Sequence, residues 1–536
     1  MSKLYFGDNL IILRQHIPDE SVDLVYLDPP FNSKRGYNLF FKTPTGQVSD
    51  AQITAFDDTW QWGEQAEHEY HELLRQPNTD VAEMLDSFRR FLKENDMMAY
   101  LTMMASRLLE LHRVLKPTGS LYLHCDPTAS HYLKILLDAV FGKTNYRTEI
   151  SWKRSAAHSD AKQGRKQYGN IRDILFFYTK SDEWQWNQQY TTYNEEYVRK
   201  MYRHVEPETG RLYQLDNLTG PGGASKGNPS YEVMGVTRHW RYSKENMAKL
   251  IEEGRVVQPS PGAVPRYKRY LDEMPGVALQ NDWGDITPPS GKEFLGYPTQ
   301  KPLALLERII QTSSTPGDVV LDPFCGCGTA VHAAQKLGRD WIGIDITHLA
   351  IHLIEKRMKN AFPALPFEVL GTPKDFAGAQ DLFSRDEYEF QWWACALVDA
   401  QPYKGKKKGS DKGIDGLIYF QDDKGGAKKI VVSVKGGKNV GRAMVADLKN
   451  TVEREKAQIG LFVTLTPPTK PMMAEAASAG FYESLKYGAF PKIQILTIEG
   501  LLAGQEAPRY PDLSRGGLTF RKAQREEGGA EQRELF

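Results

Sequence analysis

The sequence predicts an α/β fold built on a mainly parallel sheet, followed by a second, smaller α/β domain. Two apolar runs support this prediction. Residues Val22–Leu27 lead into Asp-Pro-Pro-Phe at 28–31, and residues 319–321 lead into Asp322 and a glycine-rich segment. Each pattern is typical of a buried strand that ends in a tight loop. In open α/β folds such loops lie at the carboxyl edge of the sheet, where ligands bind.

The loop after the first strand suits a planar base that carries an exocyclic amino group. Asp28 offers a carboxylate, and Pro29 offers a carbonyl whose direction is restricted because proline fixes φ. Pro30 continues the rigid loop, and Phe31 offers a ring face for stacking. A base reaches such a pocket only by leaving the duplex stack, which implies base flipping or a single-stranded substrate. The alternative interpretation is an ordinary turn at the end of a strand.

The loop after the second strand suits a nucleoside cofactor. Gly326 and Gly328 allow the backbone to approach a ligand closely, and Thr329 opens the next helix. The following strand, Asp340–Asp345, ends in a carboxylate 23 residues beyond Asp322. An acidic side chain at about that distance holds ribose hydroxyls in Rossmann-like sites. The loop lacks GxGxxG spacing, which favours a cofactor without phosphates, such as S-adenosylmethionine, over a dinucleotide.

Taken together, these motifs resemble those of the exocyclic-amino (N6-adenine/N4-cytosine) DNA methyltransferases, in the β-group arrangement where the catalytic strand precedes the cofactor strand. The chain is also similar to type III modification subunits. The resemblance implies a Rossmann-like S-adenosylmethionine-dependent methyltransferase sheet with an inserted target-recognition region. It also implies double-stranded DNA as substrate, with a homodimer and a separate restriction subunit as candidate assemblies. The matching segments, in the family's order over roughly the first 370 residues, are 7–9, 28–32, 113–117, 297–302 and 322–329.

The resemblance assigns roles to individual residues. The first loop should hold the flipped base, and Asp345 should hold the cofactor's ribose. Asp8 should lie near the cofactor's adenine, and Thr299 and Lys301 near its methionine end. For Thr299 the alternative is a capping hydroxyl at an ordinary helix start. The catalytic residues so implied are Asp28, Pro29, Pro30 and Phe31, and the cofactor-binding residues are Asp8, Thr299, Lys301, Asp322, Phe324, Gly326, Gly328, Thr329 and Asp345.

The identity of the first loop residue also distinguishes acceptors within the family. Aspartate there usually accompanies adenine N6 methylation, and serine usually accompanies cytosine N4 methylation, so Asp28 favours adenine. An N4-cytosine enzyme remains the alternative. A protein-glutamine methyltransferase would carry asparagine first and no long basic insertion, and a DNA-binding scaffold with a decayed site is the remaining competitor. The implied reaction is direct transfer from S-adenosylmethionine without a covalent enzyme intermediate.

Composition agrees with an intracellular enzyme of about three domains. The chain has 536 residues, 40% of them hydrophobic, which is ample for packed cores. Neither a membrane span nor a signal peptide is expected, so the cytoplasm is the predicted location. Four cysteines without CxxC spacing argue against a disulfide framework or structural zinc, and no metal is expected in the methyltransferase part. Cys325 and Cys327 are interpreted as packing residues of the cofactor loop.

The formal net charge is zero, so any affinity for nucleic acid must come from the distribution of charge. The segment from Trp152 to Arg172 is strongly basic and could neutralise phosphates, with Trp152, His158 and Tyr168 available for stacking. The alternative is a solvated loop. The candidate DNA-binding residues are Lys153, Arg154, Arg165 and Lys166.

The sequence predicts six segments. A catalytic half contains an amphipathic helix over 101–115, and a Gly-, Pro-, Tyr- and Arg-rich insertion separates it from a cofactor-binding half. A linker then leads to the second domain. The predicted bounds are 1–150 for the catalytic half, 151–290 for the target-recognition insertion, 291–372 for the cofactor-binding half, 373–384 for the linker, 385–510 for the second domain and 511–536 for a flexible tail.

The second domain resembles the Mrr-like branch of the PD-(D/E)xK restriction endonucleases. Asp415 precedes the first strand of a predicted hairpin, and Lys435 closes the second. In that branch an acidic residue two before the lysine completes a Mg²⁺ site, but Ser433 stands there, and a hydroxyl is a poor substitute. Glu389 could supply the missing carboxylate, but its position in a helical stretch favours the alternative of a solvated helix residue. Asp415, Ser433 and Lys435 are therefore a candidate nuclease site in which weak or absent cleavage is expected, with a fused restriction-modification enzyme as the alternative.

Overall fold

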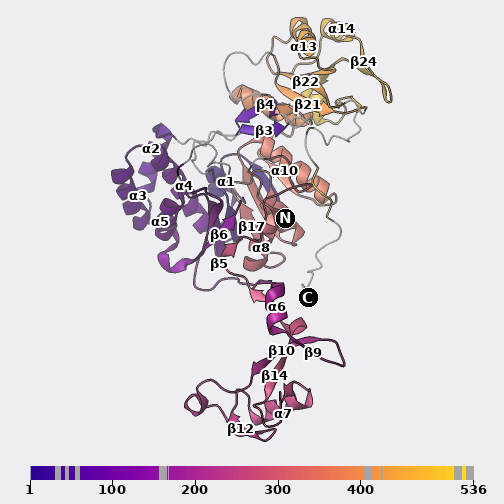
Figure 1. Cartoon of the computed structure of the whole chain (residues 1–536). Helices are drawn as coiled ribbons and strands as arrows, with labels where there is room; N and C mark the ends of the chain where they lie inside the picture. The colour runs from indigo at the N-terminus through magenta and orange to yellow at the C-terminus, as the bar shows by residue number, and fades with distance from the viewer. Residues whose placement is uncertain are drawn as a thin grey trace. The chain divides into compact units, whose positions relative to one another are not determined.

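The structure, a computed structural model shown in Figure 1, describes residues 2–30, 38–42, 48–54, 61–155, 166, 168–297, 299–403, 413–423, 426–511, 519 and 522–526. Two compact units emerge. One contains Met1–Asn187 and Asn281–Glu531, and the other contains Gln188–Gln280.

The first unit is organised around a nine-stranded sheet. From β5 to β19 all neighbouring strands run parallel, whereas β7 runs antiparallel to both of its neighbours. The predicted, mainly parallel sheet is thus confirmed. In spatial order the strands are β16 (Asp282–Trp283), β6 (Tyr146–Lys153), β7 (Arg172–Thr179), β5 (Leu115–Cys125), β2 (Val22–Leu27), β17 (Val319–Asp322), β18 (Asp340–Asp345), β1 (Lys3–Phe6) and β19 (Glu368–Leu370).

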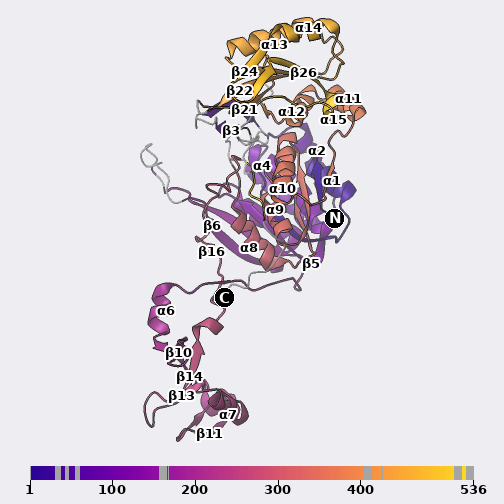
Figure 2. The same ribbon diagram turned by 90° about the vertical axis from the view of Figure 1, so that its right-hand side faces the viewer.

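Helices cover both faces of this sheet. Residues of α1, α4 and α5 share one apolar core with the sheet, and α2 and α3 pack against α4 and α5 (Figure 1). In Figure 2 the helices α8, α9 and α10 lie in front of the sheet. The bounds are α1 (Asn9–His16), α2 (Glu64–Leu73), α3 (Thr79–Leu92), α4 (Asp96–Val114), α5 (Ser130–Phe141), α8 (Leu303–Ser313), α9 (Thr329–Lys336) and α10 (His348–Ala361).

Helix α4 confirms the helix predicted from apolar spacing, since Leu101, Met104, Leu108 and Leu111 are completely buried. The prediction placed Leu115 at the end of this helix, but it begins β5 in an extended conformation. Pro117 explains the early end, because proline disfavours helical geometry in the residue before it and cannot donate a backbone hydrogen bond.

The second unit has its own small core. Trp240 and Leu218 are fully buried at its centre, beside Met247. Residue 151, where the insertion was predicted to begin, lies inside β6 of the main sheet, so the separate unit starts later. Its elements are β8 (Tyr190–Thr191), α6 (Glu195–Met201), β9 (His204–Val205), β10 (Leu212–Asn217), β11 (Ser230–Val233), β12 (Val236–His239), α7 (Lys244–Glu252), β13 (Val256–Val257), β14 (Arg266–Tyr270) and β15 (Val277–Ala278).

The C-terminal part of the first unit contains a five-stranded sheet in the order β20-β21-β22-β23-β26. The predicted hairpin is present, since β21 and β22 pair antiparallel. Helix α11 begins at Phe376, inside the predicted linker, because Asp375 caps it. The elements are α11 (Phe376–Arg385), α12 (Glu387–Leu397), β20 (Gln401–Pro402), β21 (Gly416–Phe420), β22 (Lys428–Lys435), α13 (Arg442–Arg454), β23 (Ile459–Thr464), α14 (Lys470–Ser478), β24 (Phe481–Ser484), β25 (Gly488–Pro491), β26 (Ile493–Thr497) and α15 (Ile498–Leu502).

Further short elements complete the described chain. Strands β3 (Asn38–Lys42) and β4 (Val48–Thr54) form an antiparallel pair. In the segment predicted as a flexible tail, Thr519 hydrogen-bonds the backbone of Tyr419, and Glu526 lies 2.9 Å from His332 Nε2. Two of the described residues of this segment thus contact the folded chain. Among the described helices, none combines the length and apolar composition needed to cross a membrane.

Candidate active site

Strands β2 and β17 are parallel neighbours, and so the two predicted loops open at the same edge of the sheet. The strand order changes direction at this point, the position where open α/β sheets bind ligands. A cavity of about 230 Å³ lies there. The predicted residues that line it are Asp8, Asp28, Pro30, Thr299, Lys301, Asp322, Phe324, Gly326, Thr329 and Asp345, whereas Pro29 and Gly328 do not, and Phe31 lies outside the described residues.

Asp28 is held from one side. Lys301 Nζ donates a hydrogen bond to Asp28 Oδ2 and forms an ion pair with it. The Asp28 side chain is 17% exposed, and its Oδ1 atom is buried without a hydrogen-bond partner among the described residues. Leaving a buried carboxylate oxygen unsatisfied is costly, so this atom is available to a donor that enters the cavity.

Lys301 therefore contacts the loop that follows β2. The residues before α8 are ordered by Glu293, whose carboxylate accepts from the Leu303 amide at 2.6 Å. The N-cap residue of α8 is Pro302, so Thr299 does not cap this helix, although it lines the cavity. The alternative prediction, that Thr299 supplies a capping hydroxyl at the start of this helix, is therefore wrong.

The glycine loop is shaped by two residues in left-handed conformations. Gly326 has φ +55° and Gly328 has φ +76°, both of which side chains other than glycine rarely adopt. A Cβ atom at Gly328 would lie 2.8 Å from Ile354, so packing against α10 also requires glycine there. Asp322 closes the turn by accepting a hydrogen bond from the Phe324 amide at 3.0 Å. Burial raises the pKa of Asp322 well above its usual value.

Asp345 fastens the loop to the next strand. Its Oδ2 accepts from the Gly326 amide at 2.9 Å, and its Oδ1 accepts from the Thr347 amide and hydroxyl. Desolvation outweighs these hydrogen bonds and raises the pKa of Asp345 to about 6. The carboxylate is thus ordered before any ligand arrives, which favours binding because little rotamer freedom remains to be lost.

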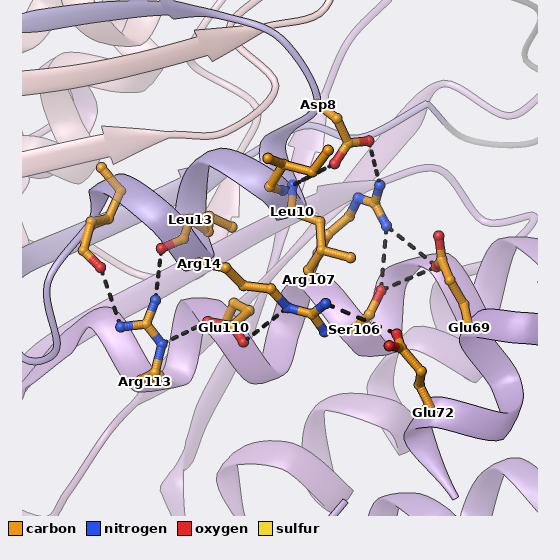
Figure 3. A network of polar contacts seen from close by, with 12 residues as sticks. Asp8, Leu10, Leu13, Arg14, Glu69, Glu72, Ser106, Arg107, Glu110 and Arg113 are labelled. Atoms are coloured by element: carbon orange, nitrogen blue, oxygen red, sulfur yellow. Dashed lines mark hydrogen bonds and ion pairs between the residues drawn. The ribbon is translucent and has the colours of Figure 1, made fainter. Parts of the chain in front are cut away.

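Figure 3 shows a polar network that includes Asp8 and Arg107, two residues that line the cavity. Asp8 caps α1 by accepting from the Leu10 amide at 2.9 Å, and its Oδ2 accepts from Arg107 at 3.0 Å. Arg107 Nε donates to the side-chain oxygen of Asn9, whose amide in turn donates to the Pro323 carbonyl at 2.9 Å. Helix α1 is thereby tied both to α4 and to the glycine loop.

Two buried arginines support the site, and sequence reasoning missed both. Arg107 on α4 holds Asp8 and Asn9, and Arg357 on α10 donates to the Cys327 carbonyl and to Thr329 Oγ1, each at 3.1 Å. Each is a lone arginine on an otherwise apolar helix face, which is the signal that could have identified it. Cys325 and Cys327 are both buried thiols in this loop, as the packing interpretation expected.

The basic segment is only partly available to a ligand. Arg154 Nη1 lies 3.0 Å from the buried carboxylate of Asp173, so its charge is engaged internally. Trp152 is buried, and its indole nitrogen donates to the Ile286 carbonyl. The prediction that Trp152 is available for stacking is therefore wrong. Lys153 is partly exposed at the end of β6 and Lys166 is exposed, while Arg165 and His158 lie outside the described residues.

The candidate nuclease residues Asp415, Ser433 and Lys435 lie close together. Asp415 Oδ2 accepts from the Val434 amide at 2.7 Å and from Ser433 Oγ at 3.3 Å, and it lies 3.5 Å from Lys435 Nζ. Glu389 lies elsewhere, 3.9 Å from His348 Nε2 on α10. Within the described part of the chain, no group of three or more His, Cys, Asp and Glu side chains could hold a metal ion.

Comparison with known proteins gives matches for both parts of the chain. A family model described as DNA methylase matches residues 22–356, and one described as NACHT-associated inactive Restriction Endonuclease 1 matches residues 395–501. Among solved structures, the cytosine-N4-specific PvuII DNA methyltransferase is 12% identical with a TM-score of 0.31, covering 66% of this chain and 86% of its own.

Three relatives are each 26% identical to this chain. They are the type II methyltransferase M.EcaI of Enterobacter cloacae, the StyLTI Mod subunit of a type III restriction-modification enzyme of Salmonella typhimurium, and the DNA adenine methyltransferase YhdJ of Escherichia coli. The alignments cover 66%, 62% and 66% of this chain and 69%, 50% and 81% of the respective relatives. Because the first family model spans more than half of the chain, the protein belongs to the N6/N4 family of DNA methylases.

Proposed function

We propose that the protein transfers a methyl group from S-adenosylmethionine to the N6 amino group of an adenine flipped out of DNA. The observation that carries this proposal is Asp28, which lines the cavity and keeps one buried carboxylate oxygen without a hydrogen-bond partner while Lys301 holds the other. An acceptor fixed in this way fits an exocyclic amino group, which has hydrogens to donate.

The residues around the glycine loop fit S-adenosylmethionine. Gly326 brings the backbone to the cavity wall, and Asp345 offers an ordered carboxylate suited to ribose hydroxyls. Asp8 and Phe324 line the same cavity and suit the adenine, and Thr299 suits the methionine end. When bound there, S-adenosylmethionine supplies the electrophilic methyl group.

The chain itself contributes positioning and electrostatics. Asp28 orients the amino group so that the nitrogen lone pair can be directed at the methyl carbon, with the Pro29 carbonyl as the second acceptor expected from sequence. The nitrogen gains positive charge as the new bond forms, and the nearby carboxylate stabilises this charge. The amino proton becomes acidic only then, so no prior deprotonation is needed, and Asp28 is the group placed to receive it.

The acceptor base is tested by mass spectrometry of nucleosides from unmethylated DNA treated with the protein and S-adenosylmethionine. N6-methyladenine is the expected product, and N4-methylcytosine would contradict the adenine assignment. Aspartate at the first loop position and the name of the relative YhdJ support adenine. The double-stranded DNA would be engaged by Lys153 and Lys166 and by residues 188–280 as the target-recognition region.

For the C-terminal module we infer a role without DNA cleavage. The carboxylate of Asp415 is already engaged by Ser433, Lys435 and a backbone amide, and the matching family model describes an inactive endonuclease. Neither observation supports Mg²⁺ there. The relative named as a Mod subunit supports a separate restriction subunit as partner, and a homodimer is the second assembly we propose to test by size-exclusion chromatography.

A further inference from the structure

The second half of the glycine loop is held by one buried side chain. Arg357 on α10 is 3% exposed, and its Nη1 donates to the Cys327 carbonyl and to Thr329 Oγ1, each at 3.1 Å. Both Cys327 and Thr329 line the cavity. The first half of the loop is fastened differently, because Asp345 accepts from the Gly326 amide at 2.9 Å. Arg357 therefore holds a part of the loop beyond the residue that Asp345 holds.

Arg357 is itself oriented by His332 on α9. The Nε atom of Arg357 donates to His332 Nδ1 at 3.0 Å, and both side chains are buried. A guanidinium can only donate, so His332 Nδ1 is an acceptor and carries no hydrogen. The hydrogen of the imidazole then lies on Nε2. Burial lowers the pKa of His332 to about 4, in agreement with a neutral ring.

Glu526 is the acceptor for this hydrogen. Its Oε1 lies 2.9 Å from His332 Nε2, and its Oε2 lies 3.5 Å from Lys336 Nζ. The Glu526 amide donates to the Ala361 carbonyl at 3.1 Å, which fastens the backbone at this residue to the end of α10. The hydrogen bond from His332 lowers the pKa of Glu526, so the acceptor is an ionised carboxylate at neutral pH.

The two hydrogen bonds of His332 depend on each other. A neutral imidazole carries one hydrogen, and the carboxylate at Nε2 keeps that hydrogen away from Nδ1. Without an acceptor at Nε2 the hydrogen can move to Nδ1, where it would oppose the Arg357 Nε hydrogen, donor against donor. The buried guanidinium would then lose a partner, and its orientation toward Cys327 and Thr329 would no longer be fixed.

We propose that Glu526, acting through His332 and Arg357, positions the second half of the glycine loop and thereby sets the affinity for S-adenosylmethionine. This inference rests on the proposed function, which requires that cofactor. None of the three residues is among those that line the cavity, so they act as positioning residues. The segment that the sequence presents as a flexible tail thereby contributes to cofactor binding.

The test is calorimetric titration of full-length variants with S-adenosylmethionine. Glu526→Met and Glu526→Gln both remove the charge that faces Lys336, and the two new side chains are similar in size. Only glutamine keeps an oxygen that can accept from His332 Nε2. Glu526→Met should weaken cofactor binding roughly three- to thirtyfold, whereas Glu526→Gln should stay within about two-fold of the unchanged protein.

Glu307→Met is the matched control. Glu307 Oε1 lies 2.9 Å from the same Lys336 Nζ, and the Glu307 side chain is 24% exposed, against 25% for Glu526. Cofactor affinity should stay within about two-fold in this variant, because the acceptor at His332 Nε2 is kept.

Three results would overturn the inference while the proposed function stands. They are unchanged affinity in Glu526→Met, equal weakening in Glu526→Met and Glu526→Gln, and equal weakening in Glu526→Met and Glu307→Met. If the unchanged protein itself binds no S-adenosylmethionine, the proposed function fails, and this inference fails with it.

Discussion

Asp28 and Lys301 lie 273 positions apart in the chain and form an ion pair at the edge of the sheet. This pair joins the loop after β2, which we propose holds the base, to the segment that leads into α8. It leaves one Asp28 oxygen for a ligand and fixes its direction, so the lysine contributes to orientation as well as to charge balance.

The first prediction concerns this pair. Lys301→Met leaves a partly buried carboxylate without its cation, so we expect the free energy of unfolding to fall by about 1.5 to 3 kcal/mol. Chemical denaturation measures this change. The control is Lys116→Met, which breaks the more exposed pair with Asp23 and should cost about 0.2 to 1 kcal/mol. If the two variants lose the same free energy of unfolding, the pair of Lys301 with Asp28 stabilises the fold no more than an exposed ion pair does.

The second prediction concerns the ribose. Asp345→Ala removes a charge-assisted acceptor and should weaken S-adenosylmethionine binding roughly ten- to a hundred-fold. Isothermal calorimetry provides the measurement. Asp340→Ala, at the other end of the same strand, should leave the affinity within about three-fold. If Asp345→Ala binds as tightly as the unchanged protein, the ribose lies elsewhere.

The third prediction follows from the pKa of Asp345, which is raised to about 6. As pH falls through this value the carboxyl takes up a proton and becomes a weaker acceptor, so cofactor affinity should fall up to about tenfold per pH unit below it. In the protein without ligand, the same raised pKa means that stability falls as pH rises from about 4 to 6, since the unfolded chain ionises first. Calorimetry between about pH 5 and pH 8 tests the affinity, and a pH profile unchanged by Asp345→Ala would assign the dependence to another group.

The fourth prediction concerns the cofactor loop. Gly328→Ala introduces both an unfavourable positive φ and a Cβ 2.8 Å from Ile354, and should lower the free energy of unfolding by more than about 2 kcal/mol. Gly338→Ala shares a positive φ of +74°, but its Cβ would meet no atom closer than 3.9 Å. Its smaller cost, about 1 to 2 kcal/mol, isolates the backbone strain. Chemical denaturation of the two variants side by side measures both losses of unfolding free energy. Equal losses would exclude close packing against Ile354 as the reason that glycine is required at position 328.

The fifth prediction concerns the C-terminal module. The full-length protein should leave unmethylated DNA intact with Mg²⁺ or Mn²⁺ and no methyl donor, because the Asp415 carboxylate is engaged within the module. Gel electrophoresis of the treated DNA is the measurement. Cleavage that disappears in Asp415→Ala would instead establish a fused restriction-modification enzyme.

Local sequence patterns predicted the strands and loops of the site. The runs before Asp28 and Asp322, and the strand ending in Asp345, are confirmed because a buried strand and the turn after it are encoded by adjacent residues. The pair of Asp28 with Lys301 could not be derived in this way, since it depends on how distant segments meet. The same holds for the bond from His332 to Glu526.

Two errors have related causes. Trp152 stands in a basic segment and was expected on the surface, but β6 is a strand of the main sheet and buries it. Arg154 was counted as a DNA contact, although a buried carboxylate 19 residues away, Asp173, engages its charge. In both cases the basic composition of the segment suggested exposed side chains. Contacts with residues distant in the sequence instead determine where these two side chains lie.

The central claim is that Asp28 orients the amino group that receives the methyl. The most direct measurement is single-turnover methylation by Asp28→Asn, with Asp126→Asn as a control at the adjacent strand end, where the carboxylate caps Thr128. We predict that Asp28→Asn produces no detectable methylated base while binding S-adenosylmethionine within about three-fold of the unchanged protein, and that Asp126→Asn remains active. Undiminished methylation by Asp28→Asn would contradict the account.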